Sequence, residues 1–268
     1  MNESFELNKI STRYIEMVET SCKKTTSLEG FLHKAHSFYP YSIRNVALIL
    51  SQNPNAMECH GADEWKARGA YIKAVPHAIQ IYAPTPPRKG ANGELQFNIT
   101  SLIDISDTNA QKTPQMVFSP QQVLELFNTI ALRKKWELVY TDAFKPTYKK
   151  ATYLDWQNRK IFIKQGENPT IQAWMVIKEY ALIKQQEDIQ KGKRSPLSLE
   201  LSNAMALVSA FEVLDYLGCY PPLLPSRAKA IILDDKSVKF VNKLKDIHKS
   251  AINIIREIKE LIAKNNKK

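Results

Sequence analysis

The hydrophobic pattern of the first 53 residues is helical. Apolar side chains recur three or four positions apart within 5–18 and again within 43–50, as they do along the buried face of a helix. Ser27, followed by an acid two residues later, indicates a further helix start between these stretches. The pattern predicts three helices, of which the last runs over about 41–51 and ends at Asn53, before a proline.

Beyond residue 77 the pattern changes to short, strand-like segments. Residues 78–83 predict a strand that a cluster of prolines ends. Residues 95–99 and 102–105 predict the returning half of a hairpin, with the basic loop 88–93 at its tip. The following residues, 106–116, are rich in Ser, Thr, Asn and Gln, and we expect them to form a linker.

The second half of the chain contains both helical and strand-like hydrophobic patterns. Ser119 and Pro120 begin a predicted helix that runs to Lys135. Further predicted elements are a strand at 136–140, a hairpin of 151–155 and 159–164, and helices at about 170–188, 197–217 and 237–263. We therefore expect an α+β fold. An N-terminal domain, 1–113, would hold helices and a small antiparallel sheet, and a mainly helical domain with a short sheet would span 114–268.

Composition agrees with a folded, cytoplasmic protein. With 268 residues, of which 44% are hydrophobic, the chain is long and apolar enough to bury a core without covalent cross-links. The three cysteines, Cys22, Cys59 and Cys219, form no CxxC pair, and we expect reduced thiols. The first residues show no basic segment followed by an apolar run, and no apolar run has membrane-spanning length, so we expect neither secretion nor membrane association.

The net charge of +11 makes a polyanionic partner plausible. Residues 1–115 are almost neutral overall, with 12 basic against 11 acidic side chains, yet the stretch 65–90 holds five cations and no acid. Proteins that bind single-stranded nucleic acid need cations and flat aromatic rings. Aromatic and amide side chains lie among these cations and before them. Together with the cations they form the candidate DNA-binding set: Tyr41, Asn45, Trp65, Lys66, Arg68, Tyr71, Lys73, Tyr82, Arg88 and Lys89. The alternative, which composition alone favours, places Trp65 and Tyr82 in a core and leaves the cations solvated.

The order of five sequence blocks resembles a known family. The blocks are 41–49 (YSIRNVALI), 52–56 (QNPNA), 65–69 (WKARG), 78–84 (AIQIYAP) and 103–108 (IDISDT). They resemble the N-terminal single-stranded-DNA-binding domain of the ArdC-type antirestriction proteins, which include LtrC-like proteins of conjugative elements. One departure follows Gly69, where the family continues with an arginine and a glycine-bearing basic turn.

The resemblance implies a protein that binds single-stranded DNA and protects it while a mobile genetic element enters a bacterial cell. In this hypothesis Trp65, Tyr71 and Tyr82 stack on bases. Asn45 positions the DNA backbone or base edges, and Tyr41 lies beside it on the same helix. The phosphates would be met by Lys66, Arg68, Lys73, Arg88 and Lys89.

In this family, as in the wider ImmA/IrrE group, the C-terminal domain is a zincin-like peptidase. Residues 153–163 and 202–218 resemble the strand pair and the later helix of that domain. Zincins need two histidines four residues apart, with a glutamate between them as the base. The corresponding run here is 178–182, KEYAL, in which only Glu179 matches.

The metal-ligand positions of this zincin-like domain carry unsuitable side chains. Lys178 would repel a dication, Leu182 has no donor atom, and the third ligand position aligns with Asn203, with Glu200 as an alternative. We therefore expect a degenerate domain with no metal, no cofactor and no enzymatic activity. Glu179 is expected to be at the surface or paired with Lys178 or Lys184.

The remaining chemistry-bearing residues form no recognisable motif. The five histidines include no pair four apart, and His33 and His36, on one helical face, are expected to be solvent-exposed and to lack acidic partners. Nucleophile and phosphate-loop motifs are missing too. Two alternatives to DNA binding remain, a protein-binding adaptor or inhibitor that uses the degenerate peptidase groove and, more weakly, an active zinc peptidase. The last predicted helix would either bind a protein partner or pack on its own domain, the interpretation we favour.

Overall fold

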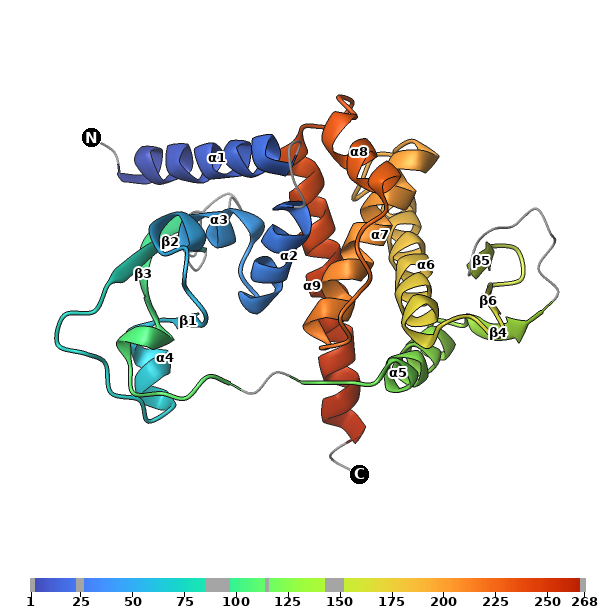
Figure 1. The fold of residues 1–268 in the computed structure, drawn as a ribbon, viewed down its shortest axis with the longest axis horizontal. Helices are drawn as coiled ribbons and strands as arrows, with labels where there is room; N and C mark the ends of the chain where they lie inside the picture. Colours follow the sequence, from blue (N-terminus) through green and yellow to red (C-terminus); the bar gives the residue numbers. More distant parts are fainter. Residues whose placement is uncertain (1–2, 23–26, 85–96, 114–115, 143–151, 266–268) are drawn as a thin grey trace, which may run out of the picture. The chain divides into compact units, whose positions relative to one another are not determined.

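The computed structural model describes residues 3–22, 27–84, 97–113, 116–142 and 152–265 (Figure 1). Helices dominate, and two small three-stranded sheets complete an α+β fold. The predicted fold class is confirmed. The chain divides into two compact units, the first formed by residues 1–27 and 37–114, the second by residues 28–36 and 115–268.

The first unit combines helices with an antiparallel sheet. Its elements are α1 (Glu3–Cys22), α3 (Ile43–Gln52), β1 (Cys59–His60), α4 (Ala62–Ala67), β2 (Ala78–Pro84), β3 (Phe97–Asp104) and the short 3-10 helix η1 (Ile105–Asp107). The strand order is β1-β3-β2, and β2 pairs with β3 from Ala78 opposite Ile103 to Pro84 opposite Phe97. Helix α3 packs on both α1 and β2. Its apolar residues are almost completely buried, so it forms the centre of this unit.

The expected linker at 106–116 is in large part structured. Thr108 forms a β-bridge with Ile72, and Asn109 donates its backbone N–H to the carbonyl oxygen of Tyr71. Thr113 donates to the carboxylate of Glu58 through its amide and its hydroxyl. The polar side chains that suggested a linker satisfy backbone groups of the first unit instead of facing only water.

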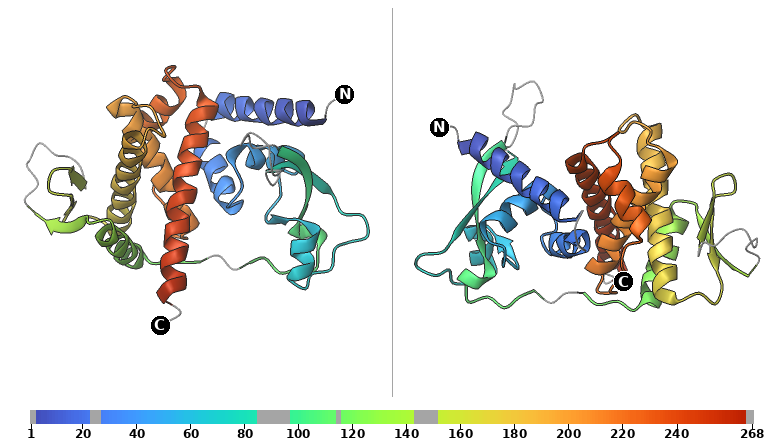
Figure 2. Two further views of the ribbon diagram at one scale, coloured as in Figure 1. Left: turned by 180° about the vertical axis from the view of Figure 1, so that it is seen from behind. Right: turned by 45° about the horizontal axis from the view of Figure 1, so that its top comes forward.

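The second unit is a helical bundle with a mixed sheet at one side (Figure 2). Its elements are α2 (Ser27–Ser37), α5 (Pro120–Arg133), β4 (Glu137–Thr141), β5 (Thr152–Asp155), β6 (Lys160–Lys164), α6 (Pro169–Gln190), α7 (Leu199–Tyr216), α8 (Ser226–Asp234) and α9 (Phe240–Asn265). In the sheet, of order β4-β6-β5, β4 runs parallel to β6 and β5 antiparallel to it. Ser119 begins α5 with a capping box completed by Gln122, as its sequence indicates.

The long C-terminal helix packs on its own unit. Helix α9 contacts α5, α6, α7 and α8, and in both views of Figure 2 it runs alongside α7. The apolar stripe that suggested a seam for a partner is buried along its length, for example at Leu244, Ile254 and Ile258. Of the two interpretations of this helix, self-packing is confirmed.

Helix α2 was expected in the N-terminal domain but belongs to the second unit. Its polar residues explain this, because Glu29 pairs with Lys229 of α8 at 3.0 Å, and His33 and His36 pair with Asp215 of α7. A helix start is visible in the local sequence, whereas partners nearly 200 residues away are not.

Two further expectations concern cysteines and membranes. Cys59 and Cys219 are free, buried thiols. Among the residues that the structure describes, no helix combines the length and the apolar character needed to cross a bilayer.

Candidate functional site

The residues predicted to bind DNA lie in the first unit, and their surroundings differ widely. Trp65 is 1% exposed and Tyr71 is 79% exposed. Tyr41 and Tyr82 are half-buried, and Asn45 is buried. The cations Lys66, Arg68 and Lys73 are exposed, whereas Arg88 and Lys89 lie outside the described residues.

Trp65 is a core residue, so its predicted role in base stacking is wrong. The indole packs in a small apolar cluster with Ala70, Ile103 and Ile105. Its Nε1–H donates to the carbonyl oxygen of Ile103 at 2.8 Å. Burying an indole on β3 fixes the short helix α4 to the sheet, because apolar burial and a satisfied N–H favour the same position. The alternative weighed from composition is correct for this residue.

Asn45 stabilises the sheet, which contradicts its predicted contact with DNA. Strand β2 lies at the edge of its sheet, where backbone groups lack a neighbouring strand. The Asn45 amide both donates to the carbonyl oxygen of Tyr82, at 2.8 Å, and accepts from the N–H of Tyr82, at 3.1 Å. Gln52, seven residues further along α3, forms the same pair of bonds with the backbone of Gln80. Two helix amides thus take the place of a missing strand.

The two half-buried tyrosines are partly committed to structure as well. The Tyr41 hydroxyl donates to the carbonyl oxygen of Cys59 at 2.9 Å. Burial raises the pKa of Tyr41 above its usual range, and Glu64 adds to the effect. The ring of Tyr82 is only partly accessible, so Tyr71 is the described member of the predicted stacking set that is fully open.

The described cations differ in how far they are engaged. Arg68 bridges the carboxylates of Glu58 (2.9 Å) and Glu64 (2.8 Å). Lys73 donates to the carbonyl oxygen of Ser106 at 2.6 Å and pairs with Asp107 at 3.5 Å, although its side chain is 60% exposed. Lys66 points to solvent without any ion pair among the described residues. Lys66 is therefore better placed than Lys73 or Arg68 to meet a phosphate.

The positions that correspond to zincin ligands are occupied by a protein-internal network. Glu179, 3% exposed, accepts from Lys178 Nζ at 3.0 Å and from the Thr152 hydroxyl at 2.8 Å. The expected pairing of Glu179 with Lys178 is confirmed, but the carboxylate is buried and Lys184 pairs with Glu257 instead.

The other two zincin positions offer no metal ligand. Leu182 is half-buried and carries no donor atom. The Asn203 amide donates to the carbonyl oxygen of Leu199 at 2.7 Å, and the alternative residue, Glu200, pairs with Arg227. A lysine ammonium bound to Glu179 and an arginine bound to Glu200 oppose a dication there, so these residues do not fit the metal that a zincin would hold.

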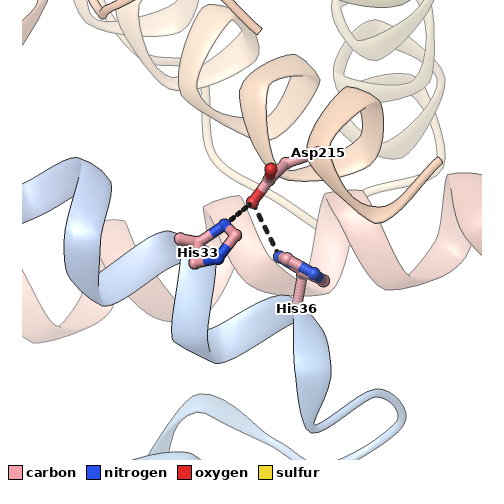
Figure 3. A group of neighbouring side chains, drawn as sticks. All are labelled: His33, His36 and Asp215. Carbon is pink, nitrogen blue, oxygen red and sulfur yellow. Dashed lines mark hydrogen bonds and ion pairs between the residues drawn. The ribbon is translucent and has the colours of Figure 1, made fainter. Parts of the chain in front are cut away.

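The structure also forms a cluster that the sequence did not predict (Figure 3). His33 and His36 of α2 point toward Asp215 of α7, with Nδ1 atoms 2.7 Å and 2.8 Å from its Oδ2 atom. The expectation that these histidines are exposed and lack an acid is wrong for His36, whose side chain is 6% exposed, and both face a carboxylate. Burial alone would raise the pKa of Asp215, but the two histidines outweigh it and hold the pKa below its usual range.

Comparison with known proteins identifies the fold. No protein-family model matches the sequence, and no curated protein matches it either. The Mn(II)-bound crystal structure of the antirestriction protein ArdC from the R388 plasmid is similar, with a TM-score of 0.57 and 10% identity, over 94% of this chain and 97% of that one. A metal-free structure of the same protein gives a TM-score of 0.43 over 81% of this chain and 84% of that one. Since the first similarity covers nearly the whole of both chains, this protein has the fold of the antirestriction protein ArdC, in agreement with the resemblance seen in its sequence blocks.

Proposed function

We propose that this protein binds single-stranded DNA through its first unit and protects the incoming DNA of a bacterial mobile genetic element. The shared fold with an antirestriction protein supports the general role. The observation that carries the DNA-binding proposal is Tyr71, a tyrosine that is 79% exposed on a fixed backbone.

The backbone around Tyr71 is held on both sides. Its N–H donates to the Asn109 side chain at 2.7 Å, and its carbonyl oxygen accepts from the Asn109 N–H at 3.1 Å. Two residues later, the N–H of Lys73 donates to the Asp107 carbonyl oxygen at 3.0 Å. An exposed ring on a rigid backbone loses little entropy when a base stacks on it, and such a stack contributes about 1–3 kcal/mol.

Exposed cations and a second exposed aromatic ring of the first unit add support. Lys73, two residues after Tyr71, has a largely exposed side chain, and Lys66 is exposed on α4. Phe97, 57% exposed, lies opposite Pro84 at the end of the β2–β3 pair. Aromatic surface and exposed cations on one unit suit a single strand, whose bases and phosphates alternate.

The direct test is fluorescence anisotropy with labelled single- and double-stranded oligonucleotides over a series of salt concentrations. We expect tighter binding of the single strand and a linear decrease of log affinity with log salt concentration, as the release of counterions requires. Equal, salt-independent affinity for both oligonucleotides would reject the proposal.

The stacking role is tested by Tyr71→Ala, with Tyr220→Ala as the matched control. Tyr220 is 83% exposed and belongs to the second unit. Loss of a base stack of about 1–3 kcal/mol predicts that Tyr71→Ala weakens single-strand binding by about 5- to 150-fold. Tyr220→Ala should leave it unchanged. If both variants bind like the parent protein, Tyr71 is not the platform.

We infer, in addition, that the second unit is a peptidase-like domain that does not catalyse metal-dependent proteolysis. The support is the buried network of Glu179 with Lys178 and Thr152, which engages the carboxylate that would have to act as the base. We expect no cleavage of unfolded casein with added Zn²⁺ or Mn²⁺. Cleavage that Glu179→Gln abolishes would overturn this inference.

A further inference from the structure

We propose that His33, His36 and Asp215 form a binding site for one divalent transition-metal ion of the zinc type. All three side chains belong to the second unit, and each offers one ligand atom, with these atoms within 4.8 Å of one another. Figure 3 shows the two imidazole rings converging from consecutive turns of α2 on the carboxylate of α7. Zinc takes nitrogen and oxygen ligands at about 2.0–2.2 Å, so ligand atoms around one tetrahedral ion lie about 3.4 Å apart. The two distances to Asp215 Oδ2, 2.7 Å from His33 and 2.8 Å from His36, would have to lengthen by only about 0.6–0.7 Å to reach this value.

The burial of His36 is the second reason for this proposal. Its side chain is 94% buried, as the exposed fraction of 6% shows, and its Nδ1 atom lies 2.8 Å from Asp215 Oδ2. A metal ion between the imidazole and the carboxylate would replace this direct contact with two coordination bonds, without bringing a new polar side chain into the buried side of the cluster.

This site is separate from the positions that zincins use. Asp215 lies twelve residues after Asn203 on α7, which at 1.5 Å per residue is about 18 Å along the helix. The zincin-like position is filled by the ion pair of Lys178 with Glu179, whereas the new cluster brings together three side chains that can each offer a ligand atom.

The ligand atom types indicate which class of metal ion the site would bind, and the exposure of His33 indicates how its coordination would be completed. Two imidazoles with one carboxylate suit zinc and similar first-row metals better than Ca²⁺ or Mg²⁺, which prefer oxygen ligands. His33 has a side chain that is 64% exposed, so water has access to one side of the cluster. Three protein ligands and a water molecule complete a tetrahedral site.

A bound ion would join two parts of the chain that are far apart in sequence. His33 and Asp215 are separated by 182 positions, and the ion would hold α2 on α7 together with the pair of Glu29 and Lys229. Because the site forms only in the folded state, binding must stabilise the second unit by mass action.

The test measures Zn²⁺ binding to the full chain, freed of metal with a chelator, by competition with a chromophoric chelator. His33→Ala is the principal variant, because an exposed side chain can be removed without a cavity. Replacing a residue that only hydrogen-bonds to a metal ligand lowers metal affinity by about 10- to 100-fold. We therefore expect the loss of a ligand itself, in His33→Ala, to lower zinc affinity by at least about a hundredfold. Asp215→Asn should weaken binding as much, while circular dichroism verifies that both variants fold.

His77→Ala is the matched control, because His77 is an exposed histidine of the first unit. The control should keep the affinity and the ratio of one ion per chain of the parent protein. Added Zn²⁺ should raise the melting temperature of the parent and of His77→Ala, but not that of His33→Ala. The proposal is overturned if the parent protein binds no zinc, or if His33→Ala and Asp215→Asn bind it as tightly as the parent.

Discussion

Asn45 is a polar residue on a helix whose other buried residues are apolar. The resemblance to the ArdC-type family suggested that its amide contacts DNA. In the structure the amides of Asn45 and Gln52 instead bond to the exposed backbone of β2. An amide carries a donor and an acceptor, so it can satisfy both groups of one backbone residue.

Replacing Asn45 by leucine should destabilise the first unit. The change removes two hydrogen bonds and leaves the backbone N–H and carbonyl oxygen of Tyr82 without these partners, at a cost of about 1–3 kcal/mol for each group that stays buried. Urea denaturation followed by circular dichroism measures the effect, and Asn242→Leu on the exposed side of α9 is the control. An unchanged unfolding midpoint for Asn45→Leu would show that the edge of β2 does not need this amide.

Trp65→Phe separates the structural role of the indole from the predicted contact with DNA. The variant keeps an aromatic ring in the apolar cluster but loses the bond from Nε1 to the Ile103 carbonyl oxygen. We expect a loss of about 1–3 kcal/mol in the free energy of unfolding, because the buried carbonyl loses its donor. Single-strand affinity at a temperature where the variant is folded should not change. A selective loss of affinity without a loss of stability would restore the stacking hypothesis.

At the scale of elements, Glu58 joins several segments of the first unit. Directly before β1, its carboxylate accepts from Thr113 and pairs with His60 and with Arg68 at the end of α4. Burial opposes ionisation, but the hydrogen bonds from Thr113 and His60 outweigh it and lower the pKa of Glu58 to about 2. These contacts tie the stretch expected to be a linker to the sheet.

The lowered pKa of Glu58 predicts that the free energy of unfolding of the first unit decreases at acidic pH. Because the pKa in the folded state lies below the ordinary value of 4.5, the ionised carboxylate contributes its full stabilisation above about pH 4.5 and loses it as the pH falls toward 2. Glu58→Gln should therefore lower the urea midpoint at neutral pH, and the difference from the parent should shrink below about pH 3. A difference that stays constant across this range would assign the loss to packing and not to charge.

At the scale of the whole molecule, the two units do not follow the order of the chain. Residues 28–36 belong to the second unit, although residues on both sides of them belong to the first. A single domain boundary near residue 114, as the polar stretch there suggested, would assign α2 to the first unit and separate it from the helices of the second unit. Leu28, Leu32 and Ala35 of this helix are almost fully buried.

A fragment of residues 115–268 should therefore be less stable than the same region in the complete chain. Without α2, the fragment loses the partners of Asp215 and Lys229, and it should also lose any zinc affinity. Adding a synthetic peptide of residues 27–38 should restore part of the stability, measured as a rise in the melting temperature. A fragment as stable as the second unit of the complete chain, with no response to the peptide, would contradict the assignment of α2.

The sequence by itself determined most elements and the fold class. The predicted strand at 136–140 and the hairpin of 151–155 and 159–164 are found within one or two residues as β4, β5 and β6. Helices α5, α6, α7 and α9 also lie where their periodicity predicted them. The short elements β1, α4 and α8 were missed, because two to nine residues carry too little periodicity.

Only the tertiary structure decided what each functional candidate touches. The sequence shows that Trp65 is aromatic and Asn45 polar. Their partners in β3 and β2, which lie 38 and 37 residues further along the chain, determine that both side chains are used inside the fold. The same holds for His33 and His36, whose acidic partner is 182 residues from His33. Periodicity reports which face of an element is buried, whereas the partner of that face depends on contacts between distant segments, which no local pattern encodes.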